Sequence, residues 1–193
     1  ENKVTTNIMI AGVGGQGSLL ASRILGNAFL SLGYDVKVSE VHGMSQRGGS
    51  VVTYVKYGEK VASPVICRGE ADFLISFELL EAARWLPYLK KGGVVVTSTQ
   101  KIEPMPVIMG VKEYPEHIVE KIEAAGVKLM HADALSLAEE CGSSKASNVV
   151  LIGMFAKHSD ISKDVFVKAV EECVPEKFRK LNLDAFEKGY ALD

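Results

Sequence analysis

A chain of 193 residues is long enough to bury one α/β core and short for two, so we expect a single domain over residues 1–193. The 22 basic and 24 acidic side chains nearly balance and 47% of the residues are hydrophobic, which is typical of a globular protein and indicates no nucleic-acid partner. No apolar run approaches the length of a membrane span. No basic segment followed by an apolar core stands at residues 1–7, so we expect a cytoplasmic protein.

The glycine-rich stretch Gly12-Val-Gly-Gly-Gln-Gly17 lies between a predicted strand at residues 7–11 and a predicted helix at 18–32. A strand, a glycine turn and a helix N-terminus form a cradle for anions such as phosphate. The glycine spacing also matches the dinucleotide fingerprint, and Glu40 ends the next predicted strand, 34–40, where a ribose-binding acid is expected. Alternatively, these glycines only allow the helix to pack closely on the sheet.

A second glycine-rich loop follows Glu40, at the strand end where open α/β sheets bind ligands, so we expect the two loops to face each other. In this loop His42 is a candidate acid–base group and Arg47 a candidate partner for phosphate or carboxylate. The structural alternative is that His42 and Gln46 hold the loop by hydrogen bonds to the backbone. Arg47 would then pair with Glu40 or Glu78.

Strand-like alternation over residues 50–57 is followed by a Gly58-Glu59 turn and another strand-like run over 61–67. This pattern predicts an antiparallel hairpin, which departs from a plain dinucleotide-binding topology. The rest of the chain alternates strands with helices, as a doubly wound sheet does: strands at 72–77, 94–98 and 127–130, and helices at 78–89, 115–125, 132–141 and 147–157. We therefore expect a three-layer α/β/α fold, a mostly parallel Rossmann-like sheet with an antiparallel hairpin insertion.

The C-terminal part carries two further predicted helices. Ser162 is expected to cap the first, and Pro175 to end it. The tail, 178–190, has apolar residues at helical spacing, and that apolar face needs a cover, for which another chain is a candidate.

Glu78 ends the strand at 72–77, at the same sheet edge as the glycine loops. It is a candidate to orient Arg47, to contact a ligand, or simply to favour the N-terminus of the next helix. The three cysteines, Cys67, Cys141 and Cys173, lie far apart without a CxxC pair, so we expect small core residues and no metal site in this chain. No nucleophile elbow, P-loop lysine or histidine pair occurs.

Three segments together resemble one known family: Gly12-Val-Gly-Gly-Gln-Gly17, Glu40-Val-His-Gly-Met-Ser-Gln-Arg-Gly-Gly-Ser-Val51 and Ser76-Phe-Glu78. They look like the small (beta) subunit of indolepyruvate:ferredoxin oxidoreductase, which corresponds to the gamma subunit or domain of the wider 2-oxoacid (pyruvate):ferredoxin oxidoreductases. The resemblance spans residues 7–190 and is carried chiefly by the long second segment.

The resemblance implies a complex whose larger alpha subunit carries thiamine diphosphate and iron–sulfur (4Fe-4S) clusters and reduces ferredoxin. That complex oxidatively decarboxylates arylpyruvates such as indolepyruvate with coenzyme A, giving aryl-acetyl-CoA, carbon dioxide and reduced ferredoxin. This chain is then expected to help close the site and to bind none of these cofactors tightly on its own. A homodimer of the isolated chain stays open.

Under this interpretation the two glycine loops form the subunit interface and receive coenzyme A phosphates, with Arg47 as the phosphate partner. The candidate ligand-binding residues are Gly12, Gly14, Gly15, Gln16, Gly17, Glu40, Ser45, Gln46, Arg47, Gly48 and Gly49. His42 and Glu78 are the candidates for a catalytic role, and no metal ligand is proposed.

Several alternatives remain open at this point. The substrate could be pyruvate, 2-oxoglutarate or a branched-chain 2-oxoacid on the same fold. A free-standing NAD(P)- or flavin-dependent oxidoreductase would use the fingerprint and Glu40 as an isolated chain. A non-catalytic assembly subunit would contribute surfaces only.

Overall fold

The structure is a computed structural model that describes residues 5–41 and 48–192. Its elements in chain order are β1 (Thr6–Val13), α1 (Ser18–Ser31), β2 (Asp35–Val41), β3 (Ser50–Gly58), β4 (Ala71–Ser76), α2 (Leu79–Trp85), the short 3₁₀ helix η1 (Leu86–Tyr88), β5 (Leu89–Ser98), α3 (Met105–Ile108), α4 (Ile118–Ala124), β6 (Lys128–Ala132), α5 (Ala134–Glu140), the 3₁₀ helix η2 (Ser144–Ala146), α6 (Ser147–Lys157), α7 (Lys163–Cys173) and α8 (Glu176–Tyr190). Among the described residues, no helix has both the length and the apolar character to cross a membrane.

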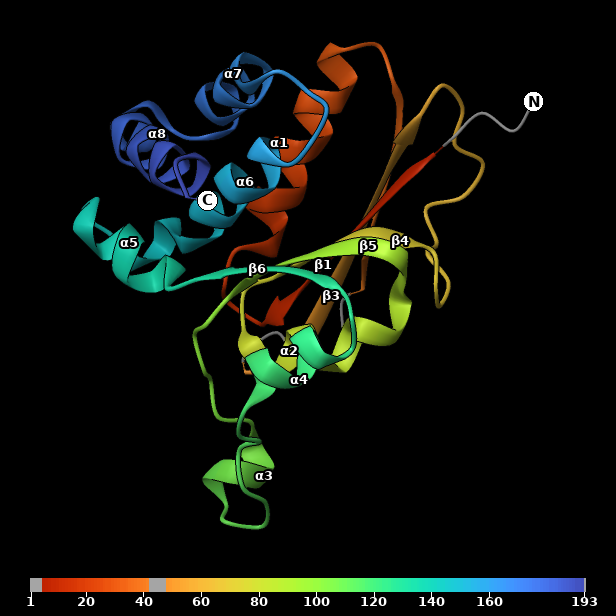
Figure 1. Cartoon of the computed structure of the whole chain (residues 1–193). Coiled ribbons are helices and arrows are strands. Elements are labelled where there is room, and N and C mark those ends of the chain that lie inside the picture. The colour runs from red at the N-terminus through yellow and green to blue at the C-terminus, as the bar shows by residue number, and fades with distance from the viewer. Residues whose placement is uncertain (1–4, 42–47, 193) are drawn as a thin grey trace.

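A six-stranded sheet in the order β2-β3-β1-β4-β5-β6 organises these elements. Strands β1, β4, β5 and β6 are parallel, whereas β3 runs antiparallel to both of its neighbours, β1 and β2. Helices α1, α5, α6, α7 and α8 lie on one side of the sheet, and α2 and α4 on the other (Figure 1). The predicted three-layer fold with an antiparallel hairpin is confirmed.

Side chains of β1 alternate between two hydrophobic cores because successive residues of a strand point to opposite faces. Ile8 and Ile10 belong to the core under the larger group of helices, and Met9 and Ala11 to the core under α2 and α4. All four are fully buried, as the unbroken apolar run predicted. This burial on both faces places the carboxyl end of β1, and with it the glycine turn, at the middle of one sheet edge.

The hairpin is formed by β2 and β3, and the predicted pairing of β3 with residues 61–67 is wrong. Both edges of β3 are taken by β1 and β2, so no edge remains for another strand. The backbone of the segment bonds to side chains instead. The N–H of Val61 donates to Asp35 at 2.8 Å, and the N–H of Cys67 donates to Glu70 at 2.8 Å.

Helices α6 and α8 cross so closely that glycine is required at the crossing. A Cβ built on Gly189 would lie 1.9 Å from the carbonyl oxygen of Val150, and one built on Gly153 would lie 2.2 Å from that of Phe186. The cover for the tail helix is therefore α6 of the same chain, and the expectation that another chain covers this face is wrong. Phe178 is 47% exposed and lies outside this contact.

Two smaller expectations also differ from the structure. Ser162 occupies the N-cap position of α7 without a side-chain cap hydrogen bond. Cys67 is exposed rather than in the core, whereas Cys141 and Cys173 are partly buried against the larger core.

Replacing Gly189 by alanine should lower the free energy of unfolding by about 3 kcal/mol, because the new methyl group overlaps the Val150 carbonyl and forces the helices apart. The matched control is Gly26→Ala in α1, where the nearest atom to the added Cβ is Val38 Cγ2 at 4.0 Å. There alanine should stabilise the protein by about 0.5–1 kcal/mol through its helix propensity. Urea denaturation measures both, and a Gly189→Ala protein as stable as the parent would contradict this crossing.

Candidate functional site

The Gly12–Gly17 turn at the end of β1 meets the second glycine loop where that loop enters β3. The N–H of Gly14 donates to the carbonyl oxygen of Gly49 at 2.9 Å. The prediction that the two loops face each other is thus confirmed for residues 48 and 49, the part of the second loop that the structure describes. Gly17 has a φ of 85° at the N-cap of α1, a backbone conformation that favours glycine. The first N–H groups of α1 are therefore directed toward this sheet edge.

Gln16 ties the turn to the ends of three neighbouring strands. Its Oε1 accepts from the N–H of Val13 at 2.8 Å, while its Nε2 donates to the carbonyl oxygen of Phe77 at 3.0 Å and to Gln100 Oε1 at 3.2 Å. These bonds join the segments that follow β1, β4 and β5. The amide of Gln16 therefore holds the shape of the turn, and its contact with a ligand remains a prediction.

Residues from α6 complete the outer side of the turn. Asn148 is 2% exposed, and its Nδ2 donates to the carbonyl oxygen of Gly17 at 3.1 Å. An added Cβ on Gly17 would lie 2.4 Å from that nitrogen, so the close contact depends on glycine. Asn148 is not among the residues predicted for the site, although a lone amide at the start of an otherwise apolar helix is a signal that could have identified it.

An open hollow of about 370 Å³ lies between the glycine turn and α6. It is lined by Gly15, Gln16, Gly17, Leu20, Gln100, Leu135, Ser144, Lys145, Ser147 and Asn148. The N-terminal ends of both α1 and α6 border it, and among the residues that the structure describes Lys145 is the one charged residue in the lining. Two helix N-termini and an exposed lysine favour a bound anion, so we call this the anion hollow.

Two buried carboxylates stand at the start of α2, on the other side of the turn. Glu78 is 1% exposed and caps α2 by accepting from the N–H of Glu81 at 2.8 Å. Its other oxygen accepts from the N–H of Ile102 at 3.1 Å and from the hydroxyl of Tyr114. The predicted role of Glu78 at the helix N-terminus is confirmed, and both of its oxygens are engaged by the chain itself.

Glu81, 4% exposed, fixes the point where the glycine loop becomes β3. It accepts from the hydroxyl of Ser50, from Trp85 Nε1 at 3.1 Å and from Arg84 Nε at 3.0 Å. Between α2 and the glycine loop lies a second hollow of about 220 Å³, lined by Val13, Gly48, Gly49, Ser50, Glu78, Leu80, Glu81, Arg84, Ile102, Pro104, Met105 and Pro106. The two carboxylates thus brace the loops that border this hollow.

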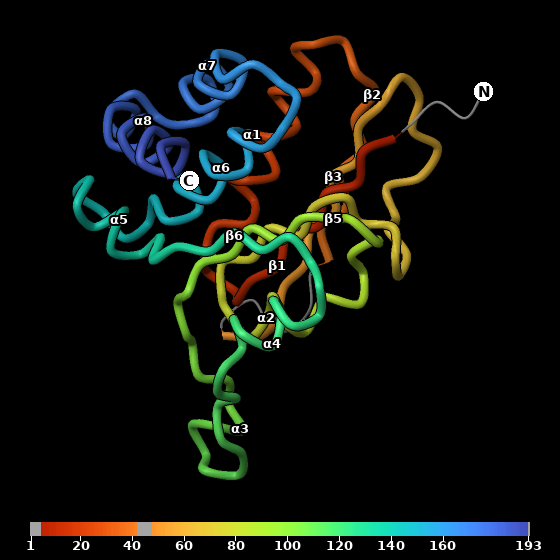
Figure 2. The backbone as a smooth tube through the Cα atoms, viewed as in Figure 1, coloured from red at the N-terminus to blue at the C-terminus, as the bar shows by residue number. Residues whose placement is uncertain are grey.

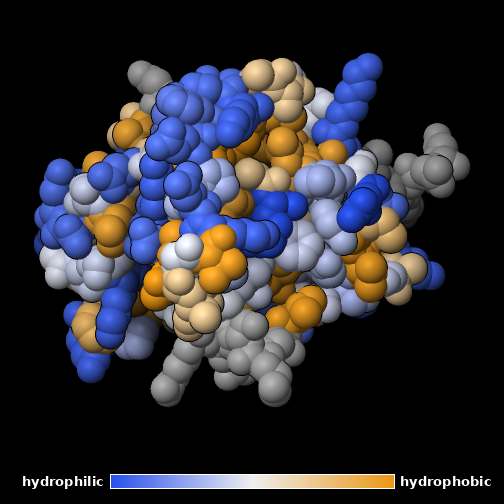
Figure 3. Space-filling model, turned by 90° about the horizontal axis from the view of Figure 1, so that it is seen from below, coloured by the Kyte–Doolittle hydropathy of each residue, from blue (hydrophilic) through white to orange (hydrophobic). Residues whose placement is uncertain are grey.

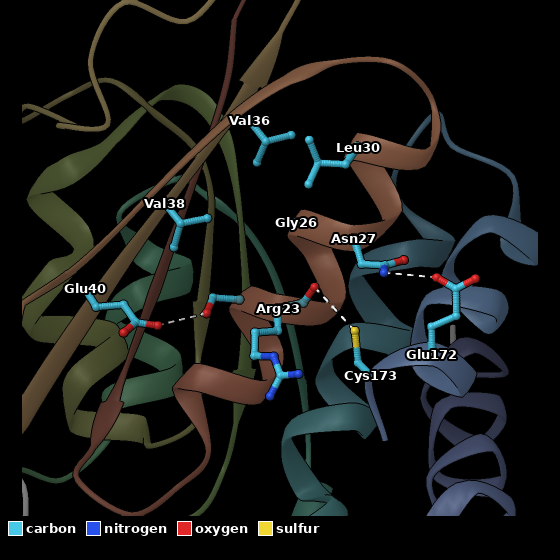
Figure 4. Close-up of a pocket in the computed structure, with 10 residues that line it drawn as sticks. Arg23, Gly26, Asn27, Leu30, Val36, Val38, Glu40, Glu172 and Cys173 are labelled. Atoms are coloured by element: carbon cyan, nitrogen blue, oxygen red, sulfur yellow. Dashed lines mark hydrogen bonds between the residues drawn. The ribbon is translucent and has the colours of Figure 1, made fainter. Parts of the chain in front are cut away.

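Glu40 faces a different part of the surface, a groove of about 520 Å³ between α1, β2 and α7 (Figure 4). Its Oε1 accepts from the hydroxyl of Ser22 at 3.3 Å. Because β3 lies between β1 and β2, the strand of Glu40 is two strand spacings, roughly 10 Å, from β1. In the dinucleotide-binding order the corresponding strands are adjacent, so this topology does not favour a shared nucleotide site for Glu40 and the glycine turn.

The remaining predicted site residues are not described by the structure. His42, Ser45, Gln46 and Arg47 lie outside the described residues, and their roles stay predictions. Within residues 5–41 and 48–192, no group of three or more histidine, cysteine, aspartate or glutamate side chains is placed to hold a metal ion.

Comparison with known proteins gives consistent matches over most of the chain. Residues 7–192 match the family described as pyruvate ferredoxin/flavodoxin oxidoreductase. The chain is 46% identical to indolepyruvate oxidoreductase subunit IorB of Thermococcus kodakarensis and 44% identical to that of Pyrococcus horikoshii, in each case over 95% of this chain and 93% of the relative.

Two solved structures share the fold at lower sequence identity. The gamma subunit of a keto/oxoacid ferredoxin oxidoreductase from Geobacter sulfurreducens superposes with a TM-score of 0.72 at 24% identity, covering 96% of both chains. The 2-oxoglutarate:ferredoxin oxidoreductase of Magnetococcus marinus, solved with 2-oxoglutarate, coenzyme A and succinyl-CoA bound, has a TM-score of 0.73 at 22% identity. That match covers 99% of this chain and 31% of the other.

Replacing Tyr114 by phenylalanine should lower the free energy of unfolding by about 2 kcal/mol, because the buried Glu78 carboxylate loses a hydroxyl donor. Burial, and then the hydrogen bond to Glu78, raise the pKa of the Tyr114 hydroxyl above its ordinary value of 10.0. The folded state therefore holds this proton more tightly than the unfolded chain, so stability should fall as the pH rises above about 10.

This alkaline loss should be smaller in the Tyr114→Phe protein. Urea denaturation between about pH 8 and about pH 11 measures this loss of stability. The control is Tyr34→Phe, a change at a partly exposed side chain, which should leave the dependence of stability on pH as in the parent. Identical profiles for the parent and Tyr114→Phe would contradict the contact with Glu78.

Proposed function

The chain belongs to the pyruvate ferredoxin/flavodoxin oxidoreductase family and is a subunit of a 2-oxoacid oxidoreductase, and we propose that it is the small subunit of an enzyme that oxidises indolepyruvate and related arylpyruvates. The proposed reaction consumes the 2-oxoacid and coenzyme A and yields aryl-acetyl-CoA, carbon dioxide and reduced ferredoxin. The name shared by the two relatives supports the choice of indolepyruvate. The bound ligands of the Magnetococcus enzyme support coenzyme A as co-substrate.

The observation that carries the proposal is the anion hollow beside the Gly12–Gly17 turn. Coenzyme A carries several phosphate groups, and phosphates bind where helix N-termini and a cationic side chain converge. The first turn of α1, which has no side-chain cap, supplies N–H donors there, and Lys145 supplies the positive charge. The first N–H groups of α6 are bonded within the chain, so α6 contributes the positive end of its dipole. We propose that this hollow receives phosphate groups of coenzyme A, together with Arg47 of the second glycine loop.

The polar side chains around the turn act in this proposal by positioning. Gln16 and Asn148 hold the glycine turn against the sheet and α6, so that the N–H groups of α1 keep one direction. Glu78 and Glu81 hold the loops around the smaller hollow. Since both oxygens of Glu78 already accept hydrogen bonds, we assign it a positioning role and no proton transfer.

We propose that decarboxylation and electron transfer take place on the larger subunit and not on this chain. Thiamine diphosphate on a larger alpha subunit would supply the electron sink for decarboxylation, and iron–sulfur clusters there would pass the electrons to ferredoxin. This chain's part is to bind and orient coenzyme A and to exclude water from the shared site.

The first experiment is anaerobic capture of the tagged chain from its host, followed by mass spectrometry and assays for iron, sulfide and thiamine diphosphate. We expect a larger, iron-rich, thiamine-binding subunit that reduces a viologen dye with indolepyruvate and coenzyme A. Pyruvate, 2-oxoglutarate and a branched-chain 2-oxoacid serve as competing substrates, and preference for one of them would correct the substrate. Recovery as a lone chain with NAD or flavin would reject the proposal.

Replacing Lys145 by glutamine should raise the KM for coenzyme A about tenfold while kcat stays near the parent value, because one charge-assisted phosphate contact is lost. Lys168→Gln is the matched control, since this lysine is 72% exposed on α7 and outside the hollow. Arg47→Ala should also raise the coenzyme A requirement and leave assembly intact. An unchanged KM for coenzyme A in the Lys145→Gln enzyme would show that the anion hollow does not bind the phosphate groups of coenzyme A.

A further inference from the structure

A short arm, residues 104–112, projects from the body of the molecule between β5 and α4 and contains α3 (Figures 1 and 2). Four of its large apolar side chains are exposed: Met105 by 63%, Ile108 by 62%, Met109 by 68% and Val111 by 71%. Figure 3, which looks at the arm from below, shows hydrophobic surface gathered there. Isolated exposed apolar residues are ordinary, but a cluster of this kind on one protruding segment marks an interaction site.

The arm is held in one conformation by its own backbone. The N–H of Met109 donates to the carbonyl oxygen of Met105 at 2.9 Å, and the N–H groups of Val111 and Lys112 donate to that of Pro106 at 2.9 and 3.0 Å. An ordered apolar tip loses little conformational entropy when a partner covers it. The exposed side chains are therefore pre-arranged for binding.

The base of the arm is anchored to the buried acid that caps α2. Glu78 accepts from the N–H of Ile102 on one side of the arm and from the hydroxyl of Tyr114 on the other. The N–H of Leu80 donates to the same hydroxyl at 3.1 Å. Both ends of the arm are thus joined to one helix, which gives it a defined direction relative to the glycine loops.

The arm is continuous with the candidate site. Pro104, Met105 and Pro106 line the smaller hollow together with Gly48 and Gly49. A protein that closes over the glycine loops therefore meets the arm as well.

We propose that the arm docks into an apolar groove of the larger subunit, with Ile108, Met109 and Val111 as its buried contacts. This inference rests on the proposed function. In the Magnetococcus enzyme the same fold makes up 31% of one polypeptide, so two thirds of that chain accompany it, and in the proposed complex the larger subunit takes that place.

The test uses the complex of this chain with the larger, thiamine-diphosphate-binding subunit, co-expressed anaerobically. The double variant Ile108→Asp/Met109→Asp should bind that subunit about 100-fold more weakly, because two buried apolar contacts become buried charges. The matched control is Phe178→Asp on α8, a large apolar residue that is 47% exposed away from the arm, which should bind as the parent does. Thermal melting of each isolated chain should stay at the parent value, since these side chains are exposed.

A photo-crosslinking residue at position 109 reports direct contact. Met109→p-benzoylphenylalanine should crosslink to the larger subunit, and the same change at Phe178 should not. The inference is overturned if the double variant assembles as tightly as the parent, or if the isolated chain forms a dimer that the double variant abolishes. If the parent chain binds no larger subunit, both the proposed function and the docking of the arm are rejected. If the parent and the double variant both assemble with the larger subunit, only the docking of the arm is rejected.

Discussion

The antiparallel ladder between β1 and β3 sets the geometry on which the rest of the site depends. Its register pairs Val13 with Ser50, so the residues just beyond it, Gly14 and Gly49, join through their backbones. The same register brings Ser50 to the buried carboxylate of Glu81. The insertion of β3 also separates β2 from β1, which places Glu40 beside α1 and α7 rather than at the turn. The position of β3 thus brings the two glycine loops together and keeps Glu40, the predicted nucleotide-binding acid, away from them.

The polar groups of the site divide into those that shape it and those that are available to a ligand. Gln16, Asn148 and Glu78 all form hydrogen bonds within the chain. Asn148 and Glu78 are buried, and buried polar groups are costly to leave unpaired. The N-terminus of α1, which has no side-chain cap, and Lys145 border the anion hollow. In the proposed function, this arrangement binds and orients the phosphate groups of coenzyme A.

The two faces of the turn serve different proposed partners. The anion hollow opens between the turn and α6, whereas the smaller hollow opens between the turn, α2 and the arm. Glu78 holds the two ends of the arm, and Glu81 holds Ser50, where the second glycine loop enters β3. The segment proposed to dock the larger subunit and the loop proposed to bind coenzyme A are therefore both attached to the first turn of α2. Binding of the larger subunit at the arm would then align the glycine loops with its cofactor, because both are attached to the same end of α2.

The sequence by itself determined the local elements and the family. The apolar run before Gly12, the glycine turn and the helical spacing after it required only interactions between near neighbours, so β1, the turn and α1 were predicted correctly. Only the tertiary structure decided which strands pair and which distant residues meet. Whether β3 pairs with residues 61–67 or inserts beside β1, and whether α8 packs on α6, depends on competition between contacts remote in the chain. The lone amide in an apolar helix could have marked Asn148 as a polar site, but its partner Gly17 lies 131 positions away and is decided only by how α6 packs beside the turn.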